Sequence, residues 1–140
     1  MPASPTFTPP APQPNAPLVV IADDSRLVRI KLSRLLTAAG FRVAEATNGQ
    51  EALDMLQRGE LPSVLITDLE MPSMDGFELI AAVHGAIETE HVPIVAITAN
   101  EDLQARVGDL SGVYGIFRKP WNDRALIQRV RALSVVAYAH

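Results

Sequence analysis

The sequence predicts an α/β domain built on one parallel sheet with helices on both of its faces. From Leu18 onward, short apolar runs alternate with amphipathic stretches, and five such pairs follow one another. This alternation is typical of repeated strand–helix units, which join parallel strands through right-handed crossovers. The apolar runs are almost uninterrupted, as expected for strands that are covered on both sides.

The first two strand–helix units are marked by sharp changes of pattern. Residues 18–22 predict a strand, and residues 25–39 predict a helix that ends at Gly40, because glycine commonly follows a helix C-terminus. Residues 42–46 predict the second strand and residues 49–57 the second helix. Side chains spaced three and four apart form the inward stripe of each helix: Val28, Leu32, Leu35, Leu36, Ala52, Leu53 and Leu56.

The last three units repeat this order. Each consists of a strand and then a helix: 63–67 and a helix beginning near Gly76, 93–97 and 101–110, 114–118 and 123–137. The final helix carries an inward stripe of Leu126, Ile127, Val130 and Leu133. The whole pattern therefore predicts five strands and five helices in strict alternation.

Composition sets limits on the class of protein. The chain has 140 residues, 48% of them hydrophobic, which suffices for one core. Its net charge of −4 gives no broad basic surface, so direct binding to nucleic acid is not expected. No apolar run reaches the roughly 18 residues that a membrane span needs. The absence of cysteine excludes disulfides and thiolate chemistry, and we expect a cytoplasmic protein.

The first 17 residues differ from the rest of the chain. They hold most of the prolines and no charged side chain, and they offer little apolar surface to bury. A segment of this composition is expected to be disordered. The predicted division is therefore a proline-rich tail over 1–17 and one domain over 18–140.

Polar groups suited to phosphoryl chemistry follow four of the five predicted strands. Asp23 and Asp24 follow the first strand, Asp68 the third, Thr98 the fourth and Lys119 the fifth. The carboxyl ends of parallel strands meet at one edge of the sheet, where ligands bind. Carboxylates gathered there repel one another unless a cation neutralises them, which favours Mg²⁺. The hydroxyl and the ammonium group suit phosphoryl oxygens.

Each of these residues also has an ordinary structural interpretation. Asp23, Asp24 and Ser25 stand where a helix begins, and such residues often cap helices. Asp68 could belong to a turn, and Thr98 could cap the next helix. An isolated lysine is usually a solvated surface charge. These interpretations do not explain why four strand ends carry compatible groups at once, so we favour the functional one.

The segments that contain these residues resemble bacterial response-regulator receiver domains. The resemblance rests on VVIADDSR at 19–26, ITDLEMPSMDG at 66–76, Thr98-Ala99 and Lys119-Pro120, in this order. It extends over about 18–133. It implies a flavodoxin-like (βα)5 receiver fold with strand order 2-1-3-4-5, similar to that of single-domain chemotaxis regulators.

The resemblance implies that Asp68 is the phosphoacceptor of a two-component phosphorelay. Its carboxylate would take the phosphoryl group from a sensor histidine kinase or a phosphotransfer protein and later lose it to water. Mg²⁺ would be bound by Asp24, Asp68 and the main-chain carbonyl of Glu70, with Asp23 acting through a water molecule. The chain would catalyse only its own phosphorylation and dephosphorylation, so we do not expect an enzyme with turnover.

The resemblance further implies a conformational switch. Thr98 would move to bond the phosphoryl group, Lys119 would contact a phosphoryl oxygen, and the peptide bond between Lys119 and Pro120 would be cis. The surface formed by the fourth helix, the fifth strand and the fifth helix would change and control a protein partner, with dimerisation of the phosphorylated form left open. The chain departs from the family at Ile116, where an aromatic switch residue is usual.

Two other functions are left open by the residues. An aspartate-nucleophile phosphohydrolase would use Asp68 as nucleophile and Glu70 as general acid. Such enzymes usually carry aspartate in place of Glu70 and need an inserted cap, for which this chain has little length. A pseudo-receiver that acts only as an interaction module would normally lack an acidic residue or the lysine, and neither is missing here.

Overall fold

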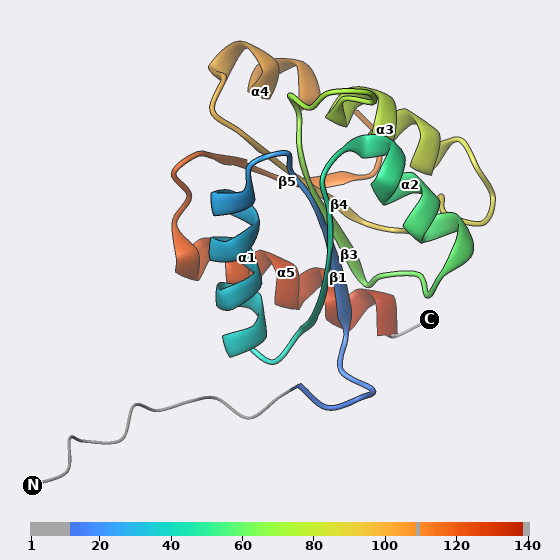
Figure 1. Ribbon diagram of the computed structural model, residues 1–140, viewed down its shortest axis with the longest axis vertical. Coiled ribbons are helices and arrows are strands. Elements are labelled where there is room, and N and C mark those ends of the chain that lie inside the picture. The colour runs from blue at the N-terminus through green and yellow to red at the C-terminus, as the bar shows by residue number, and fades with distance from the viewer. Residues whose placement is uncertain (1–11, 109, 139–140) are drawn as a thin grey trace, which may run out of the picture.

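A computed structural model describes residues 12–108 and 110–138, which contain one parallel sheet. Its strands are β1 (Leu18–Ala22), β2 (Arg42–Ala46), β3 (Val64–Asp68), β4 (Ile94–Thr98) and β5 (Val113–Arg118). Their order, β2-β1-β3-β4-β5, is the predicted one, and all four pairings are parallel (Figure 1). The three inner strands are almost wholly buried, which explains why their sequences are apolar throughout.

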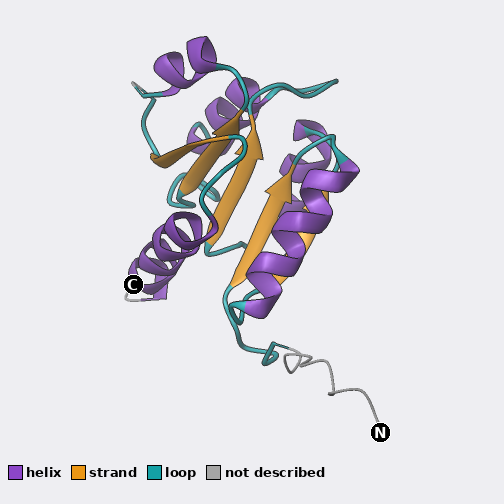
Figure 2. Cartoon of the chain, turned by 90° about the vertical axis from the view of Figure 1, so that its left-hand side faces the viewer, coloured by secondary structure: helices purple, strands orange, loops and turns teal. Residues whose placement is uncertain are grey.

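Helices cover both faces of this sheet (Figure 2). Within the described residues they are α1 (Arg26–Ala38), α2 (Gly49–Arg58), α3 (Gly76–His84), α4 (Glu101–Val107) and α5 (Asp123–Tyr138). The apolar side chains of α1 and α5 pack on one face, and those of α2, α3 and α4 pack on the other, so the sheet separates two apolar clusters. None of these helices combines the length and the apolar character needed to cross a membrane.

Each described helix begins at a side chain that accepts a backbone N–H from its first turn. These capping residues are Ser25, Asn48, Asp75, Asn100 and Asn122. Such caps satisfy N–H groups that have no partner within the helix. The helix boundaries lie within one residue of the predicted ones, with α4 as the exception. It ends at Val107 instead of residue 110, because the N–H of Leu110 bonds to the Val107 carbonyl and the chain turns towards β5.

The beginning of the domain is tied to β2. The N–H of Arg42 donates to the Pro17 carbonyl at 2.9 Å, and its Nε donates to the Ala16 carbonyl at 2.8 Å. The same guanidinium group forms a two-pronged ion pair with Glu60. Ala16 and Pro17, which lie within the segment expected to be a tail, therefore contact the domain. Residues 1–11 of that segment lie outside the described residues.

Candidate functional site

Three carboxylates come together where β1 and β3 end. Asp23 and Asp24 follow β1 directly, and Asp68 is the last residue of the neighbouring strand β3. One oxygen from each carboxylate lies within 4.8 Å of the others. Asp23 and Asp68 are buried, with 1% and 7% of their surface exposed, whereas Asp24 is exposed. The structure thus brings together the three acids that the sequence placed at this edge.

The turn after β1 fixes the position of Asp23. Its Oδ1 accepts the N–H of Ser25 at 2.8 Å, and its carbonyl accepts the guanidinium group of Arg29 at 2.8 Å. Ser25 in turn caps α1, because its Oγ accepts the N–H of Val28. Of the three residues that could cap this helix, Ser25 has that role, and both aspartates remain available to the site.

The loop that carries Asp68 is held by hydrogen bonds and by close packing against α3. Asp68 Oδ1 accepts the N–H of Leu69 at 2.8 Å and that of Glu70 at 3.4 Å. A Cβ atom added to Gly76 would lie 2.3 Å from the Asp68 carbonyl oxygen and 2.7 Å from the Leu69 Cα. Because these atoms belong to the backbone, only glycine fits at the start of α3.

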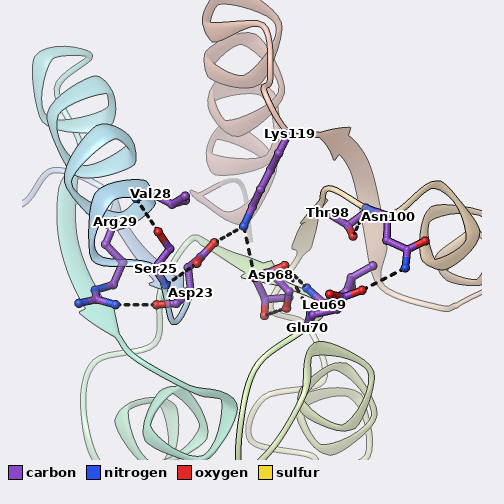
Figure 3. A network of polar contacts seen from close by, with 11 residues as sticks. Asp23, Ser25, Val28, Arg29, Asp68, Leu69, Glu70, Thr98, Asn100 and Lys119 are labelled. Carbon is purple, nitrogen blue, oxygen red and sulfur yellow. Dashed lines mark hydrogen bonds and ion pairs between the residues drawn. The ribbon is translucent and has the colours of Figure 1, made fainter.

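Lys119, which follows β5, reaches across to the acidic cluster (Figure 3). Its Nζ donates to Asp23 Oδ2 at 2.9 Å and lies 3.2 Å from Asp68 Oδ2. Its N–H donates to the Thr98 carbonyl at 2.9 Å, and its peptide bond to Pro120 is cis. A single ammonium group therefore offsets part of the charge of three neighbouring carboxylates.

The protonation equilibria of the cluster reflect this partial compensation. Burial raises the pKa of Asp68, and the charge of Asp23 raises it further, while Lys119 and the N–H of Glu70 act in the opposite direction. Burial by itself lowers the pKa of Lys119, but its hydrogen bond to Asp23 and the attraction of both carboxylates raise it overall. The cluster keeps an excess of negative charge that a proton or a further cation can relieve.

In metal-free solution, we expect wild type to lose stability relative to Asp68→Asn as the pH rises. A group whose pKa is higher in the folded chain stabilises the fold below its unfolded pKa, and this contribution is lost as the pH rises through the folded pKa. Burial and the charge of Asp23 raise the pKa of Asp68 above its ordinary value of 3.8, so the loss begins near that pH and continues above it. Thermal unfolding in EDTA at several pH values measures it. A difference that stays constant with pH would contradict the buried-charge explanation.

The end of β4 brings a hydroxyl group to the same edge of the sheet. Thr98 is 1% exposed, and its Oγ1 accepts the N–H of Asn100 at 3.0 Å. Thr98 ends β4, the strand that pairs with β3, and its carbonyl bonds to Lys119. It does not cap α4, since Asn100 has that role. Thr98, Asp68 and Lys119 thus stand at the carboxyl ends of three adjacent strands.

Sequence reasoning missed Asn100, which connects α4 to the loop after Asp68. Its Oδ1 accepts the N–H groups of Asp102 and Leu103, and its Nδ2 donates to Glu70 Oε1 at 3.1 Å (Figure 3). The capping role had a signal in the sequence, because asparagine directly precedes an acidic helix start. The bond to Glu70 had no signal in the sequence, because it joins residues that are 30 positions apart.

The aromatic residues of β5 do not compensate for Ile116. Ile116 is half-buried and packs with the apolar cluster under α2, α3 and α4. Phe117 contacts the cluster on the opposite face, and Tyr114 has 55% of its surface exposed. Position 116 therefore offers no ring that could exchange a buried for an exposed position.

The donor set at the acidic cluster fits a bound Mg²⁺. Carboxylate oxygens are the hard ligands that Mg²⁺ prefers, and Asp23, Asp24 and Asp68 supply them within a short distance of one another. Burial, together with the charge of Asp23, raises the pKa of Asp68 even beside Lys119, so a further cation would favour its ionised form. Glu70 lies two residues after Asp68 on the same loop.

Comparison with protein families gives one match that spans most of the chain. The model for the response regulator receiver domain matches residues 19–131. The transcriptional regulatory protein AfsQ1 of Streptomyces coelicolor is 34% identical over 118 residues, which are 84% of this chain and 51% of that protein. A 14.6 kDa protein of Leptolyngbya boryana is 39% identical over 81% of this chain and 86% of its own length. The chain spans about half or less of AfsQ1 and of the response regulators MprA and PleD.

Solved structures with the same fold include two from signalling proteins. The chemotaxis response regulator CheY4 of Vibrio cholerae has a TM-score of 0.76 and 31% identity, covering 85% of this chain and 99% of that one. The signal receiver domain of a signal transduction histidine kinase from Syntrophus aciditrophicus has a TM-score of 0.78 and 28% identity. The match covers 86% of this chain and 91% of that one.

Proposed function

The chain belongs to the response regulator receiver domain family, and from this premise we propose that Asp68 is phosphorylated with the help of Lys119 and Mg²⁺. The observation that carries the proposal is the ammonium group of Lys119, which lies 2.9 Å from Asp23 and 3.2 Å from Asp68. This arrangement places a cation, a nucleophile and further acids beside one another at one buried point. A solvated lysine or a simple helix cap does not require that combination.

The proposed step transfers a phosphoryl group to Asp68 from a kinase phosphohistidine or from a small acyl phosphate. An electron pair on a carboxylate oxygen of Asp68 attacks phosphorus and forms a new O–P bond. The bond from phosphorus to the donor breaks, and its electron pair leaves with the donor nitrogen or oxygen. Lys119 favours the unprotonated carboxylate before the step and offers its charge to the phosphoryl oxygens during it.

Mg²⁺ when bound supplies positive charge that offsets the charge of the transferring group. The residues that would hold it are Asp24, Asp68 and the main-chain carbonyl of Glu70, with Asp23 acting through water. Support comes from the three carboxylates, whose oxygens lie within 4.8 Å of one another. Water later hydrolyses the acyl phosphate, so the chain acts on its own Asp68 and is not an enzyme with turnover.

The proposal includes a switch and its partners. Thr98, buried at the end of β4, would move to bond the phosphoryl group, and the surface of α4, β5 and α5 would then control a downstream protein. A sensor histidine kinase or a phosphotransfer protein would act as the donor. A cytoplasmic location belongs to the same proposal and is supported by the cysteine-free sequence.

The decisive experiment is incubation of the full chain with acetyl phosphate and Mg²⁺, followed by intact mass measurement. We expect a mass increase of one phosphoryl group, which is absent in EDTA and is lost after mild treatment with base. Absence of any adduct in the presence of Mg²⁺ would contradict the proposal and favour an interaction module. Continuous product release from a phosphoester, over many turnovers, would indicate a phosphohydrolase instead.

A further inference from the structure

Two contacts hold α4 and its capping residue to the segment after β3, one to the loop after Asp68 and one to α3. The Nδ2 of Asn100 donates to Glu70 Oε1 at 3.1 Å, and the guanidinium group of Arg106 lies 4.4 Å from the centre of the Phe77 ring. A cavity of about 620 Å³ lies beside both contacts and is lined by residues of the loop, of α3 and of α4. Because a cavity borders the helix here, the contacts that cross it have a large share in fixing the position of α4.

Asn100 is the more central of the two contacts, since it takes part in three interactions at once. Its N–H donates to Thr98 Oγ1, its Oδ1 caps α4, and its Nδ2 donates to Glu70. One residue, through its backbone N–H and its side chain, therefore connects the hydroxyl group beside the site, the loop after Asp68 and the start of α4. Among the described residues, no other hydrogen bond joins that loop to α4 or to its capping residue.

Apart from this junction, few contacts hold α4 in place. It has seven residues, and Val107 is the one that is fully buried. Its ion pair with β5, between Glu101 and Arg118, has both side chains more than 60% exposed, and such pairs contribute little. A short helix with few apolar contacts can shift at low cost in free energy. The restraint at its first residue therefore has a large influence on where it lies.

We propose that Asn100 is the positioning residue that transmits phosphorylation of Asp68 to α4, in a chain where Ile116 cannot act through an aromatic swap. The proposal rests on the proposed function. A movement of Thr98 Oγ1 towards a phosphoryl group takes it away from the N–H of Asn100. The start of α4 then loses one of its restraints and separates from Glu70, so the helix becomes free to adopt a second position.

Two substitutions separate this coupling role from the role of a helix cap. Asn100→Ser keeps an oxygen that can cap α4, because serine is as good a cap as asparagine, but it is too short to reach Glu70. Asn100→Ala removes both the cap and the bridge. Asn122→Ser is the matched control, since Asn122 caps α5 in the same way, at the far end of β5 from the loop after Asp68 in the sequence.

The experiment measures amide hydrogen exchange of residues 100–107 in the full chain by mass spectrometry, with and without acetyl phosphate and Mg²⁺. Intact mass measured on the same samples gives the occupancy of Asp68. In wild type, phosphorylation should speed exchange in this segment about fivefold, the scale of losing one hydrogen bond. In Asn100→Ser, exchange without the phosphodonor should already approach the phosphorylated wild-type rate, and the response should fall by half or more. Asn122→Ser should respond like wild type.

Each outcome has a separate meaning. If Asn100→Ser at equal occupancy responds like wild type, Asn100 is a helix cap only and the inference is wrong. The inference is also wrong if wild type is phosphorylated and exchange in 100–107 does not change. If Asn100→Ala exchanges faster than Asn100→Ser without the phosphodonor, the cap and the bridge are separate restraints, as proposed. Absence of an adduct in wild type overturns the proposed function itself, and the intact mass reveals that case directly.

Discussion

The Asp68→Asn chain is expected to take up no phosphoryl group under conditions where wild type is labelled completely. Asparagine has nearly the same shape as aspartate, so the backbone bonds from Leu69 and Glu70 to its side-chain oxygen can remain. The amide lacks the anionic oxygen that attacks phosphorus, so the covalent step has no nucleophile. Intact mass measurement after incubation with acetyl phosphate and Mg²⁺ decides the result.

The same substitution should weaken the effect of Mg²⁺ on stability. A ligand that binds only the folded chain raises its unfolding temperature, by an amount that follows its affinity. Asp68→Asn removes one of the three carboxylates at the cluster, so Mg²⁺ should raise the unfolding temperature of wild type more than that of the variant. Differential scanning calorimetry with Mg²⁺ and with EDTA measures both shifts.

The matched control is Asp75→Asn, which makes the same chemical change in the same connection between β3 and α3. Asp75 caps α3, and asparagine caps a helix equally well. This variant should be labelled and stabilised by Mg²⁺ like wild type. Labelling of Asp68→Asn to the wild-type level would show that another residue accepts the phosphoryl group.

The Gly76→Ala chain is expected to be less stable than wild type by about 2–3 kcal/mol, because the added methyl group has no space. It would lie 2.3 Å from the Asp68 carbonyl oxygen and 2.7 Å from the Leu69 Cα. Alanine favours a helix over glycine by about 1 kcal/mol, so the steric effect must exceed that gain. The midpoint of urea unfolding measures the loss, and labelling should fall as well, because the loop of Asp68 must move.

Gly108→Ala provides the comparison for this substitution. An added Cβ there would lie 3.6 Å from the Ala105 carbonyl oxygen, an ordinary contact, and the backbone has φ −55°. At such a position alanine is neutral or stabilising by up to about 1 kcal/mol. Equal stability changes at positions 76 and 108 would contradict the steric explanation for Gly76.

The sheet and the acidic cluster could be predicted from the sequence because each depends on a local signal. Long apolar runs mark strands that are covered on both faces, and in a parallel sheet the next residue lies at the edge where ligands bind. Asp68 and Thr98 illustrate the rule, although each proves to be the last residue of its strand instead of the first residue beyond it. The strand order came from the resemblance and agrees with the structure.

Contacts between loops could not be predicted in the same way. The bond between Asn100 and Glu70 depends on how two loops turn after their strands, and no periodic pattern records that. The end of α4 was placed three residues too late, because the amphipathic pattern continues to Leu110 while the backbone already turns after Val107. Tertiary contacts decide both features, and intrinsic propensity is too weak to indicate them.

The contact between Asp23 and Lys119 has a consequence for newly made chains. Asp23 and Lys119 are 96 residues apart in sequence, and the strand order of the sheet brings them together. Contacts between residues so distant in sequence close long loops, which costs conformational entropy, and they tend to form late in folding. A nascent or partly folded chain in which β5 is not yet in place therefore lacks the contact between Lys119 and the acids. If Asp68 is phosphorylated as proposed, a signalling pathway that depends on Lys119 would respond only to chains in which the sheet is complete.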